Sequence, residues 1–215
     1  MITLDRFKEC LDKLDELLDE RKFVHCPDPE HMEPMTIKAI GGFALLYYDI
    51  RSMGYTNDID TVTLDYSDWV LDCIEEIAVR EGLPLNWINN DTVYDGDVEI
   101  VDQLIGAVWI ESSFKLNNIK LYVAGLATLF QSKLIASEDD NLTKRDQDFP
   151  DLVDILKQLG CVYTNDVFVL ARGLDINIRV EYPRNYKRIF QTFPKPPDVG
   201  TAYAGSYVFN RKQGV

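Results

Sequence analysis

The sequence predicts an α+β (mixed α/β) protein, with a small mixed sheet flanked by helices and with helical additions. Three observations predict this class. Short apolar or alternating segments, typical of strands, alternate with segments whose apolar residues recur at helical spacing. Glycine and proline separate these segments, and no internal repeat is visible. At 215 residues, 46% of them hydrophobic, the chain is long enough for one sizeable core with a small appended subdomain.

The first part of the chain predicts a helix, a loop, a strand and a second helix. The first helix is amphipathic, with a leucine-rich face opposite a charged face. Prolines break the chain after it, and a double glycine ends the strand. In chain order we expect a helix over Leu4–Phe23, a loop over Cys26–Pro34, a strand over Met35–Ile40 that ends at Gly41-Gly42, and a helix over Phe43–Met53.

The rest of the chain predicts more strands and then mainly helices. We expect a strand over Asp58–Leu64, a helix over Ser67–Arg80, an irregular stretch over Leu85–Leu104, strands over Ala107–Phe114 and Ile119–Val123, helices over Leu126–Ala136, Asp148–Leu159 and Asp166–Arg172, and a tail with no clear pattern. The predicted organisation is an N-terminal helix and proline-rich loop over residues 1–34, a core over 35–125, and a C-terminal helical subdomain with a basic tail over 126–215.

Charge and cysteine content narrow the function classes. The net charge of −14 repels phosphate backbones, which disfavours an extended nucleic-acid groove. The segment from Arg179 to Val215 is the exception, with seven basic and two acidic side chains; it is either a solvated tail or an arm that meets an anionic ligand or acidic partner. No apolar run is long enough to span a bilayer. Four scattered cysteines without a C-x-x-C pattern predict neither disulfides nor zinc, so we expect a cytoplasmic protein.

Two carboxylates on a predicted strand are the first candidate for chemistry. Asp58 and Asp60 are two residues apart, so in a strand they leave the same face. Such a pair repels unless a cation lies between its members, and Mg²⁺ takes one or two carboxylates together with substrate phosphate oxygens. In a chain with 36 acidic residues, however, D-x-D alone is more typical of surface charge.

The double glycine is the second candidate. Gly41 and Gly42 stand between a strand and a helix, where they allow close approach of a ligand and leave helix N–H groups available for phosphate. Glycines at such a point often serve only the turn. Strand, Gly-Gly, helix and a strand bearing D-x-D together are more specific, because they bring a phosphate site and a metal site to neighbouring strand ends.

This combination resembles the DNA polymerase beta-like nucleotidyltransferase superfamily, whose pattern is Gly-Gly or Gly-Ser followed by D-x-D on the next strand. Ile40–Leu45 with Thr56–Asp60 is most similar to the bacterial branch that holds the abortive-infection (AbiEii-like) toxins. The resemblance covers about residues 35–160. It implies a nucleotidyltransferase fold, with Asp58 and Asp60 as metal ligands and with Gly41, Gly42 and Thr56 at the nucleotide.

A second block extends the resemblance. Ser132–Ala136 and Arg145–Leu152 are similar to the "K-L-x-A" and "R-x-K-D-x-x-D-L" segments of these relatives, with Gln147 in the usual lysine place. The resemblance implies that Lys133 and Asp148 belong to the active site, with Lys133 screening triphosphate charge. The alternative is that Lys133 reaches solvent while Asp148 and Asp151 begin the next helix. A structural salt bridge equally explains Arg145 and Asp151.

Two departures from the pattern bear on activity. Gly54 stands where the relatives often carry an arginine, and Arg51 is a candidate replacement. Active members of the superfamily also use a third carboxylate on a later strand, but Ile119–Val123 offers none. Glu111, Asp97 and Glu99 are the nearest candidates, and each is equally explained as surface charge.

Two hypotheses about function follow. The first is an enzyme that uses Mg²⁺ or Mn²⁺ and moves an NMP from an NTP to an acceptor. The resemblance implies a toxin–antitoxin or phage-defence setting, with tRNA, a protein or a small molecule as acceptor, an antitoxin as partner, and no membrane. The second is a catalytically silent nucleotide-binding or partner-binding module of the same fold. The missing third acid and Gly54 favour the second hypothesis.

Overall fold

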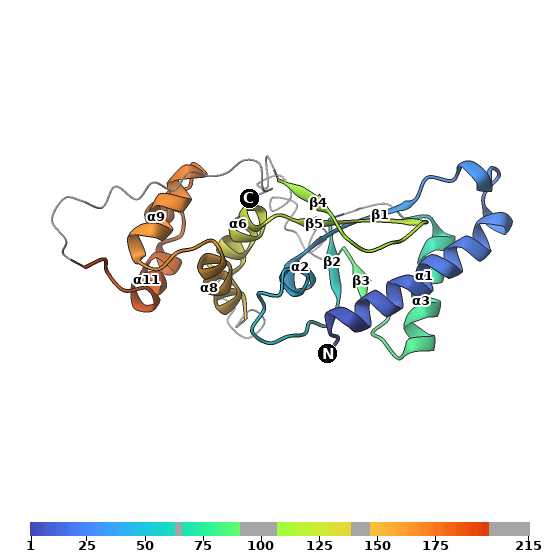
Figure 1. Ribbon diagram of the computed structural model, residues 1–215, viewed down its shortest axis with the longest axis horizontal. Coiled ribbons are helices and arrows are strands. Elements are labelled where there is room, and N and C mark those ends of the chain that lie inside the picture. Colours follow the sequence, from blue (N-terminus) through green and yellow to red (C-terminus); the bar gives the residue numbers. More distant parts are fainter. Residues whose placement is uncertain (63–65, 91–106, 139–146, 198–215) are drawn as a thin grey trace. The chain divides into compact units, whose positions relative to one another are not determined.

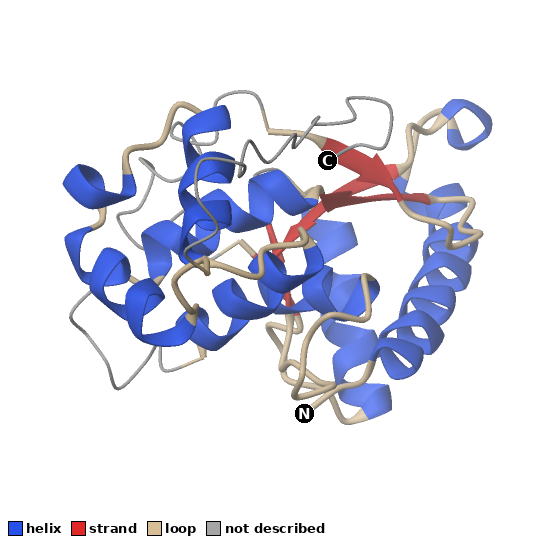
Figure 2. Cartoon of the chain, turned by 60° about the vertical axis from the view of Figure 1, so that its left-hand side comes forward, coloured by secondary structure: helices blue, strands red, loops and turns tan. Residues whose placement is uncertain are grey.

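The computed structural model describes residues 1–62, 66–90, 107–138 and 147–197 (Figure 1). By its internal contacts the chain divides into two compact units, Met1–Gly125 and Leu126–Val215. The first unit holds a small sheet with flanking helices, and the second is helical in its described part (Figure 2). The predicted mixed α+β class is therefore confirmed. The predicted nucleotidyltransferase fold is finer than this architecture and stays a proposal.

The first unit is built on a five-stranded mixed sheet in the order β3-β2-β1-β5-β4. The strands are β1 (Met35–Ile40), β2 (Ile59–Thr61), β3 (Ile88–Asn89), β4 (Trp109–Glu111) and β5 (Ile119–Ala124). The pairs β1–β5 and β2–β3 are parallel, whereas β1–β2 and β4–β5 are antiparallel. Because β2 runs against β1, the start of β2 lies beside the end of β1.

Among the described residues of the first unit, three helices accompany this sheet, with α1 and α3 side by side in Figure 1. They are α1 (Leu4–His25), α2 (Gly41–Tyr47) and α3 (Asp68–Glu81), and a short 3-10 turn, η1, covers Pro29–His31. The periodic leucines of α1 are buried, as its sequence pattern predicts. Gly82, in the left-handed conformation with φ 66°, ends α3.

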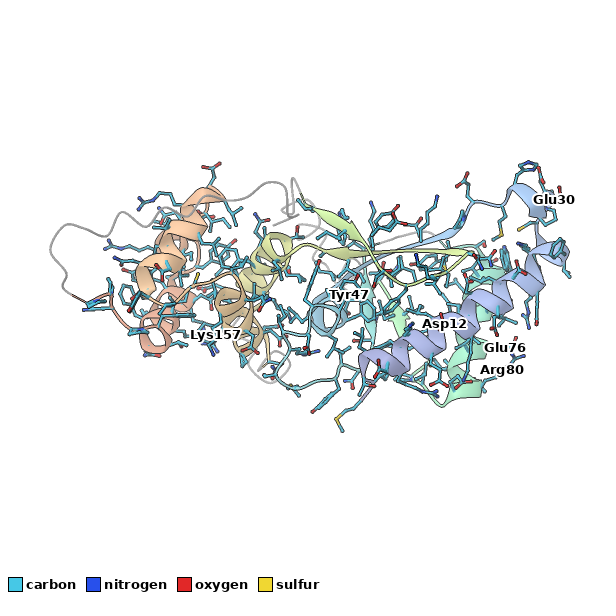
Figure 3. All side chains as sticks on the ribbon, in the orientation of Figure 1. Asp12, Glu30, Tyr47, Glu76, Arg80 and Lys157 are labelled. Carbon is cyan, nitrogen blue, oxygen red and sulfur yellow. The ribbon has the colours of Figure 1, made fainter. Side chains whose placement is uncertain are left out.

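Polar contacts fasten α1 to its neighbours. The buried carboxylate of Asp15 accepts hydrogen bonds from the backbone N–H groups of Asn117 and Asn118, in the turn before β5. Arg21 of α1 is paired with Glu76 of α3, and Arg80 lies one turn from Glu76 on the same helix (Figure 3).

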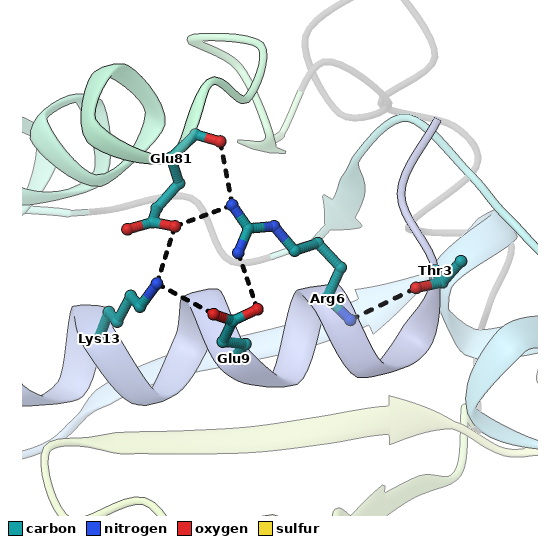
Figure 4. Close-up of polar contacts among 5 residues, drawn as sticks. All are labelled: Thr3, Arg6, Glu9, Lys13 and Glu81. Carbon is teal, nitrogen blue, oxygen red and sulfur yellow. Dashed lines mark hydrogen bonds and ion pairs between the residues drawn. The ribbon is translucent and has the colours of Figure 1, made fainter.

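A second ion-pair cluster joins the N-terminal half of α1 to the end of α3 (Figure 4). Glu81, at the end of α3, accepts from Arg6 at 2.8 Å and from Lys13 at 2.8 Å. Both cations also contact Glu9 on α1. The N-terminal helix is thus tied to the sheet and to α3, and it belongs to the first unit.

The second unit consists of helices in its described part. They are α6 (Leu126–Ala136), α8 (Asp148–Gln158), α9 (Thr164–Gly173), α10 (Ile178–Glu181) and α11 (Pro183–Thr192). Helices α6 and α8 pack together, and so do α10 and α11. Glu138 accepts from the backbone N–H groups of Arg184 and Asn185, which satisfies the first turn of α11.

Several predicted elements differ from the structure. The helix expected over Phe43–Met53 ends at Tyr47, because Asp49 takes the left-handed conformation with φ 54°. The strands expected over Asp58–Leu64 and Ala107–Phe114 are short, and β3 lies within a stretch predicted to be irregular. Helices α10 and α11 occupy part of the predicted featureless tail.

The structure also bears on the cysteines and on membrane-spanning segments. All four cysteines are free thiols, and Cys10, Cys73 and Cys161 are buried, in agreement with the absence of a predicted disulfide. Among the described residues, no helix has the length and apolar character needed to cross a membrane.

Candidate active site around the double glycine

The double glycine lies at the junction between β1 and α2. Strand β1 ends at Ile40, and Gly41 turns the backbone with φ 66°, a conformation that L side chains rarely adopt. Gly42 follows in the first turn of α2 and is buried. The turn therefore requires glycine at position 41 for backbone reasons alone.

The carboxylate of Asp60 lies against this turn. Asp60 pairs with Ile40 across the antiparallel β1–β2 ladder, directly before the glycines. A Cβ placed on Gly41 would lie 2.5 Å from Asp60 Oδ2, so Asp60 occupies the space that a side chain at position 41 would need. The two features that the sequence singled out thus converge at one point in the first unit.

Asp58 directly precedes β2. Burial alternates along this stretch: Ile59 and Thr61 are buried, whereas Asp58 and Asp60 are partly exposed. The alternation agrees with the expectation that both aspartates leave the face opposite Ile59. Two partly exposed carboxylates thus lie beside the Gly41 turn.

Gly42 is covered by two polar side chains that follow α2. A Cβ at Gly42 would overlap the guanidinium of Arg51 and would lie 2.5 Å from Thr56 Oγ1. Thr56 is held in place by a two-way backbone pairing with Ile2, at 2.7 and 3.0 Å. Arg51, rather than Gly54, therefore brings a cation to the double glycine, and around Gly54 there is open space.

The third carboxylate is not found among the described residues. No group of three or more metal-binding His, Cys, Asp or Glu residues occurs there. Glu111 is exposed on β4, and three strand spacings, or roughly 14 Å, separate β4 from β2, so this candidate lies far across the sheet from Asp60. Asp97 and Glu99 lie outside the described residues, so these two candidates stay untested.

Two polar residues near Asp60 were missed by the sequence analysis. Asn89, on β3, is the register partner of Asp60 and is 9% exposed. Lys38 lies two residues before Ile40 on β1, so it shares the face of the sheet that carries Asp60. Lys38 also lies over the Trp109 ring at 5.8 Å. An N-N dipeptide and a lone lysine in a strand gave too little signal for either to be chosen.

The other predicted cluster lies in the second unit, where its charged side chains pair with one another. Lys133 on α6 donates to Asp148 Oδ1 at 2.5 Å and lies 3.0 Å from Asp151 Oδ2, both on α8. Asp151 is fully buried, and Gln147 also donates to it at 3.1 Å. Lys133 and Asp148, which the resemblance groups together, form an ion pair, and the alternative that Lys133 reaches solvent is wrong.

The charge state of Lys133 follows from these contacts. Burial of the ammonium group opposes its charge, but the two aspartates outweigh burial, and the pKa of Lys133 is raised. Lys133 is therefore a fixed cation. Asp148 and Asp151 also occupy the first turn of α8, as the structural alternative expected. Arg145, the remaining member of this block, lies outside the described residues.

Comparison with known proteins adds no family assignment. No protein-family model, no curated protein and no solved structure matches this chain. We therefore infer function from the geometry of the chain itself.

Proposed function

We propose that the first unit carries a magnesium-dependent nucleotidyltransferase site, which moves an NMP from an NTP to an acceptor hydroxyl. The observation that supports this proposal is the convergence of the double glycine with the Asp60 carboxylate, with Asp58 two residues away. The resemblance of Gly41-Gly42 and Asp58-Ile59-Asp60 to the superfamily motif points in the same direction.

The donor set fits a magnesium ion. Asp58 and Asp60 supply hard carboxylate oxygens, both partly exposed, and Mg²⁺ commonly uses one or two carboxylates and fills its remaining positions with phosphate oxygens and water. A bound ion would neutralise the carboxylate pair and the phosphate charge. Asp58 and Asp60 are the residues that we expect to hold it.

The chain's own groups supply the remaining requirements for phosphate. Gly41 and Gly42 carry no side chains of their own, so the polar groups of neighbouring residues lie directly against the turn. Arg51 and Thr56 lie against Gly42 and offer a cation and a hydroxyl. The participation of Lys133 and Asp148 in nucleotide binding or catalysis stays a proposal, since a structural ion pair between α6 and α8 also explains their contacts.

The acceptor is not specified by these residues. The net charge of −14 favours a small molecule or a protein hydroxyl over a long RNA as the acceptor. The family resemblance suggests tRNA, so tRNA is included among the acceptors in the experiment below. The toxin–antitoxin or phage-defence setting is proposed on the same resemblance.

A second candidate function is a silent nucleotide-binding module. The absence of a three-residue acidic cluster in the described part of the chain favours it, because two carboxylates bind a metal nucleotide without supplying a base. This candidate predicts NTP binding in Mg²⁺ without transfer to any acceptor.

The test is label transfer from each α-labelled NTP, with Mg²⁺ or Mn²⁺, to tRNA, to protein and to small hydroxyl compounds. The enzyme proposal expects Asp58→Asn and Asp60→Asn each to lower the rate by at least about a hundredfold. Glu111→Gln is the matched control, because this carboxylate lies on the far edge strand, and it should retain the full rate. Equal rates in all three variants would exclude the proposed site.

A further inference from the structure

The second unit contains a pocket that no part of the proposed reaction uses. It has a volume of about 510 Å³ and lies among α9, α10 and α11. This size is within the range of pockets that hold small organic ligands. We call it the aromatic–arginine pocket, after the residues that line it: Phe168, Tyr186, Phe190, Arg172 and Arg179.

Three aromatic rings form one side of this pocket. Phe168 lies 5.3 Å from Tyr186 and 5.5 Å from Phe190, and Tyr186 lies 4.9 Å from Phe190, between ring centroids. Phe190 remains 39% exposed although it is a large apolar residue. Partly exposed, mutually packed rings provide a rigid face on which a flat ligand can stack.

Two arginines bring positive charge to the same pocket. Within the described part of the chain, the Arg172 and Arg179 guanidinium groups form no ion pair or side-chain hydrogen bond. The neighbouring Arg188 is used differently, since its guanidinium stacks on Phe149 at 3.7 Å. Arg172 and Arg179 are therefore available to an anionic group, which an arginine binds through parallel hydrogen bonds.

The rest of the lining consists of two amides, one carboxylate (Asp175) and the apolar Ala171, Ile176 and Ile178, so the two arginines outnumber the acid. Asn165 and Asn177 are exposed at the pocket, and each side chain offers both a donor and an acceptor. The edge of a nucleobase carries donors and acceptors side by side, so it can form hydrogen bonds with both amides. A simple aromatic acid lacks this pattern of donors and acceptors. Stacking rings, amides and guanidinium groups thus match a base and a phosphate.

We propose that the aromatic–arginine pocket binds a nucleoside 5′-monophosphate, with the base on the rings and the phosphate at Arg172 and Arg179. A single nucleotide is favoured over a nucleic-acid strand, because the pocket has the size of one small ligand and the chain carries a net charge of −14. The proposal does not depend on nucleotidyl transfer in the first unit.

The test is calorimetric titration of the full chain with AMP, GMP, CMP and UMP in the presence of EDTA. EDTA removes the divalent ion on which the site in the first unit depends. We expect at least one nucleotide to bind, and the matching nucleoside and inorganic phosphate each to bind at least about tenfold more weakly. A double variant, Arg172→Gln with Arg179→Gln, should weaken nucleotide binding at least about tenfold.

Two variants serve as controls. Lys187→Gln with Lys195→Gln removes two exposed cations of the same region that do not line the pocket, and it should bind as the wild type does. Asp58→Asn with Asp60→Asn should also bind normally, which separates this pocket from the proposed active site. Circular dichroism would verify that each variant is folded.

Four outcomes would overturn the proposal: no binding at millimolar nucleotide, unchanged binding by the folded arginine variant, loss of binding in the aspartate variant, or much tighter binding of a tetranucleotide than of its mononucleotide. The last outcome would assign the pocket to single-stranded nucleic acid.

Discussion

At the scale of single residues, Gly41 tests whether the turn and Asp60 depend on each other. Gly41→Ala places a Cβ on a left-handed backbone and 2.5 Å from Asp60 Oδ2. We expect it to lower the free energy of unfolding by about 1–3 kcal/mol and to displace the carboxylate. Urea unfolding measures the loss.

Gly54→Ala is the matched control for this variant. Gly54 has the same sign of φ, at 68°, but nothing lies within 4 Å of the Cβ that it would gain. It therefore reports the backbone strain alone. If both variants lose the same stability and bind NTP equally well, Asp60 is not held in place by the turn.

Lys133 is the residue whose removal should cost most in the second unit. Lys133→Met keeps much of the side-chain volume but leaves Asp151, which is fully buried, without its cation. We expect a loss of about 3–5 kcal/mol in the free energy of unfolding at neutral pH. Lys157→Met, on the exposed side of α8, should change it by less than about 0.5 kcal/mol.

The pH dependence of this effect has a definite sign. Because the pKa of Lys133 is raised in the folded state, its contribution is complete below the usual lysine pKa of 10.5 and is lost as pH rises through the folded value. The difference between wild type and Lys133→Met should therefore be constant from neutral pH to about pH 10. Chemical unfolding at several pH values checks this, and a difference that shrinks already at neutral pH would contradict it.

For single residues, the sequence predicted contacts between two site residues better than it predicted the further residues around them. The order of strand, double glycine, helix and D-x-D strand predicted that Gly41 and Asp60 meet, and the resemblance grouped Lys133 with Asp148. Asp151 was treated as a helix start, and its role as the buried partner of Lys133 was left open, since burial depends on packing between α6 and α8. Asn89 was missed because β3 is only two residues long.

At the scale of elements, the contact between α1 and α3 depends on Glu81. Its hydrogen bond with Lys13, opposed by slight burial and assisted by Arg6, lowers the pKa of Glu81. The stability from this pair is present above the usual glutamate pKa of 4.5 and is lost as pH falls through the folded value. Glu81→Gln should therefore be less stable than wild type at pH 7, and the gap should close in acid.

The matched control for this prediction is Glu16→Gln. Glu16 is exposed on α1, outside the Glu81 cluster, so its removal should give a pH-independent difference near zero. Thermal melts of the three proteins at several pH values measure these gaps. A gap for Glu81→Gln that widens as pH falls would be inconsistent with the observed cluster.

The elements that the sequence predicted well are those with long apolar patterns. Met35–Ile40 and Leu126–Ala136 match β1 and α6, because the first is a buried run and the second an apolar helix. Helix α11 lies in the part of the chain that was predicted as a tail with no clear pattern, and Pro183 stands in its first turn, where proline is tolerated. Helix α2 is shorter than predicted because Asp49 takes the left-handed conformation soon after Tyr47. The spacing of apolar residues gives no sign of this backbone conformation.

At the scale of the whole molecule, charge is the property that the sequence determines outright. The acidic excess behind the net charge of −14 lies in the first unit: residues 1–125 carry 25 acidic and 10 basic side chains, whereas residues 126–215 carry 11 acidic and 12 basic ones. Such a charge opposes the compact state through mutual repulsion, whereas the exposed ion pairs around Glu81 favour it. Solvent and salt screen such pairs, so each contributes little, and we expect repulsion to dominate the response to salt.

Added salt should therefore stabilise this protein. Raising the ionic strength from about 0.01 M to about 0.15 M shortens the screening length from about 30 Å to about 8 Å, which weakens repulsion across the whole surface. We expect Tm to rise by about 2–4 °C, measured by calorimetry in NaCl. A double reversal of exposed acids on α1, Asp12→Lys with Glu16→Lys, lowers the net negative charge and should flatten this rise. A fall in Tm with salt would mean that the attractive pairs outweigh the net charge, and the repulsion argument against a long nucleic-acid acceptor would lose its basis.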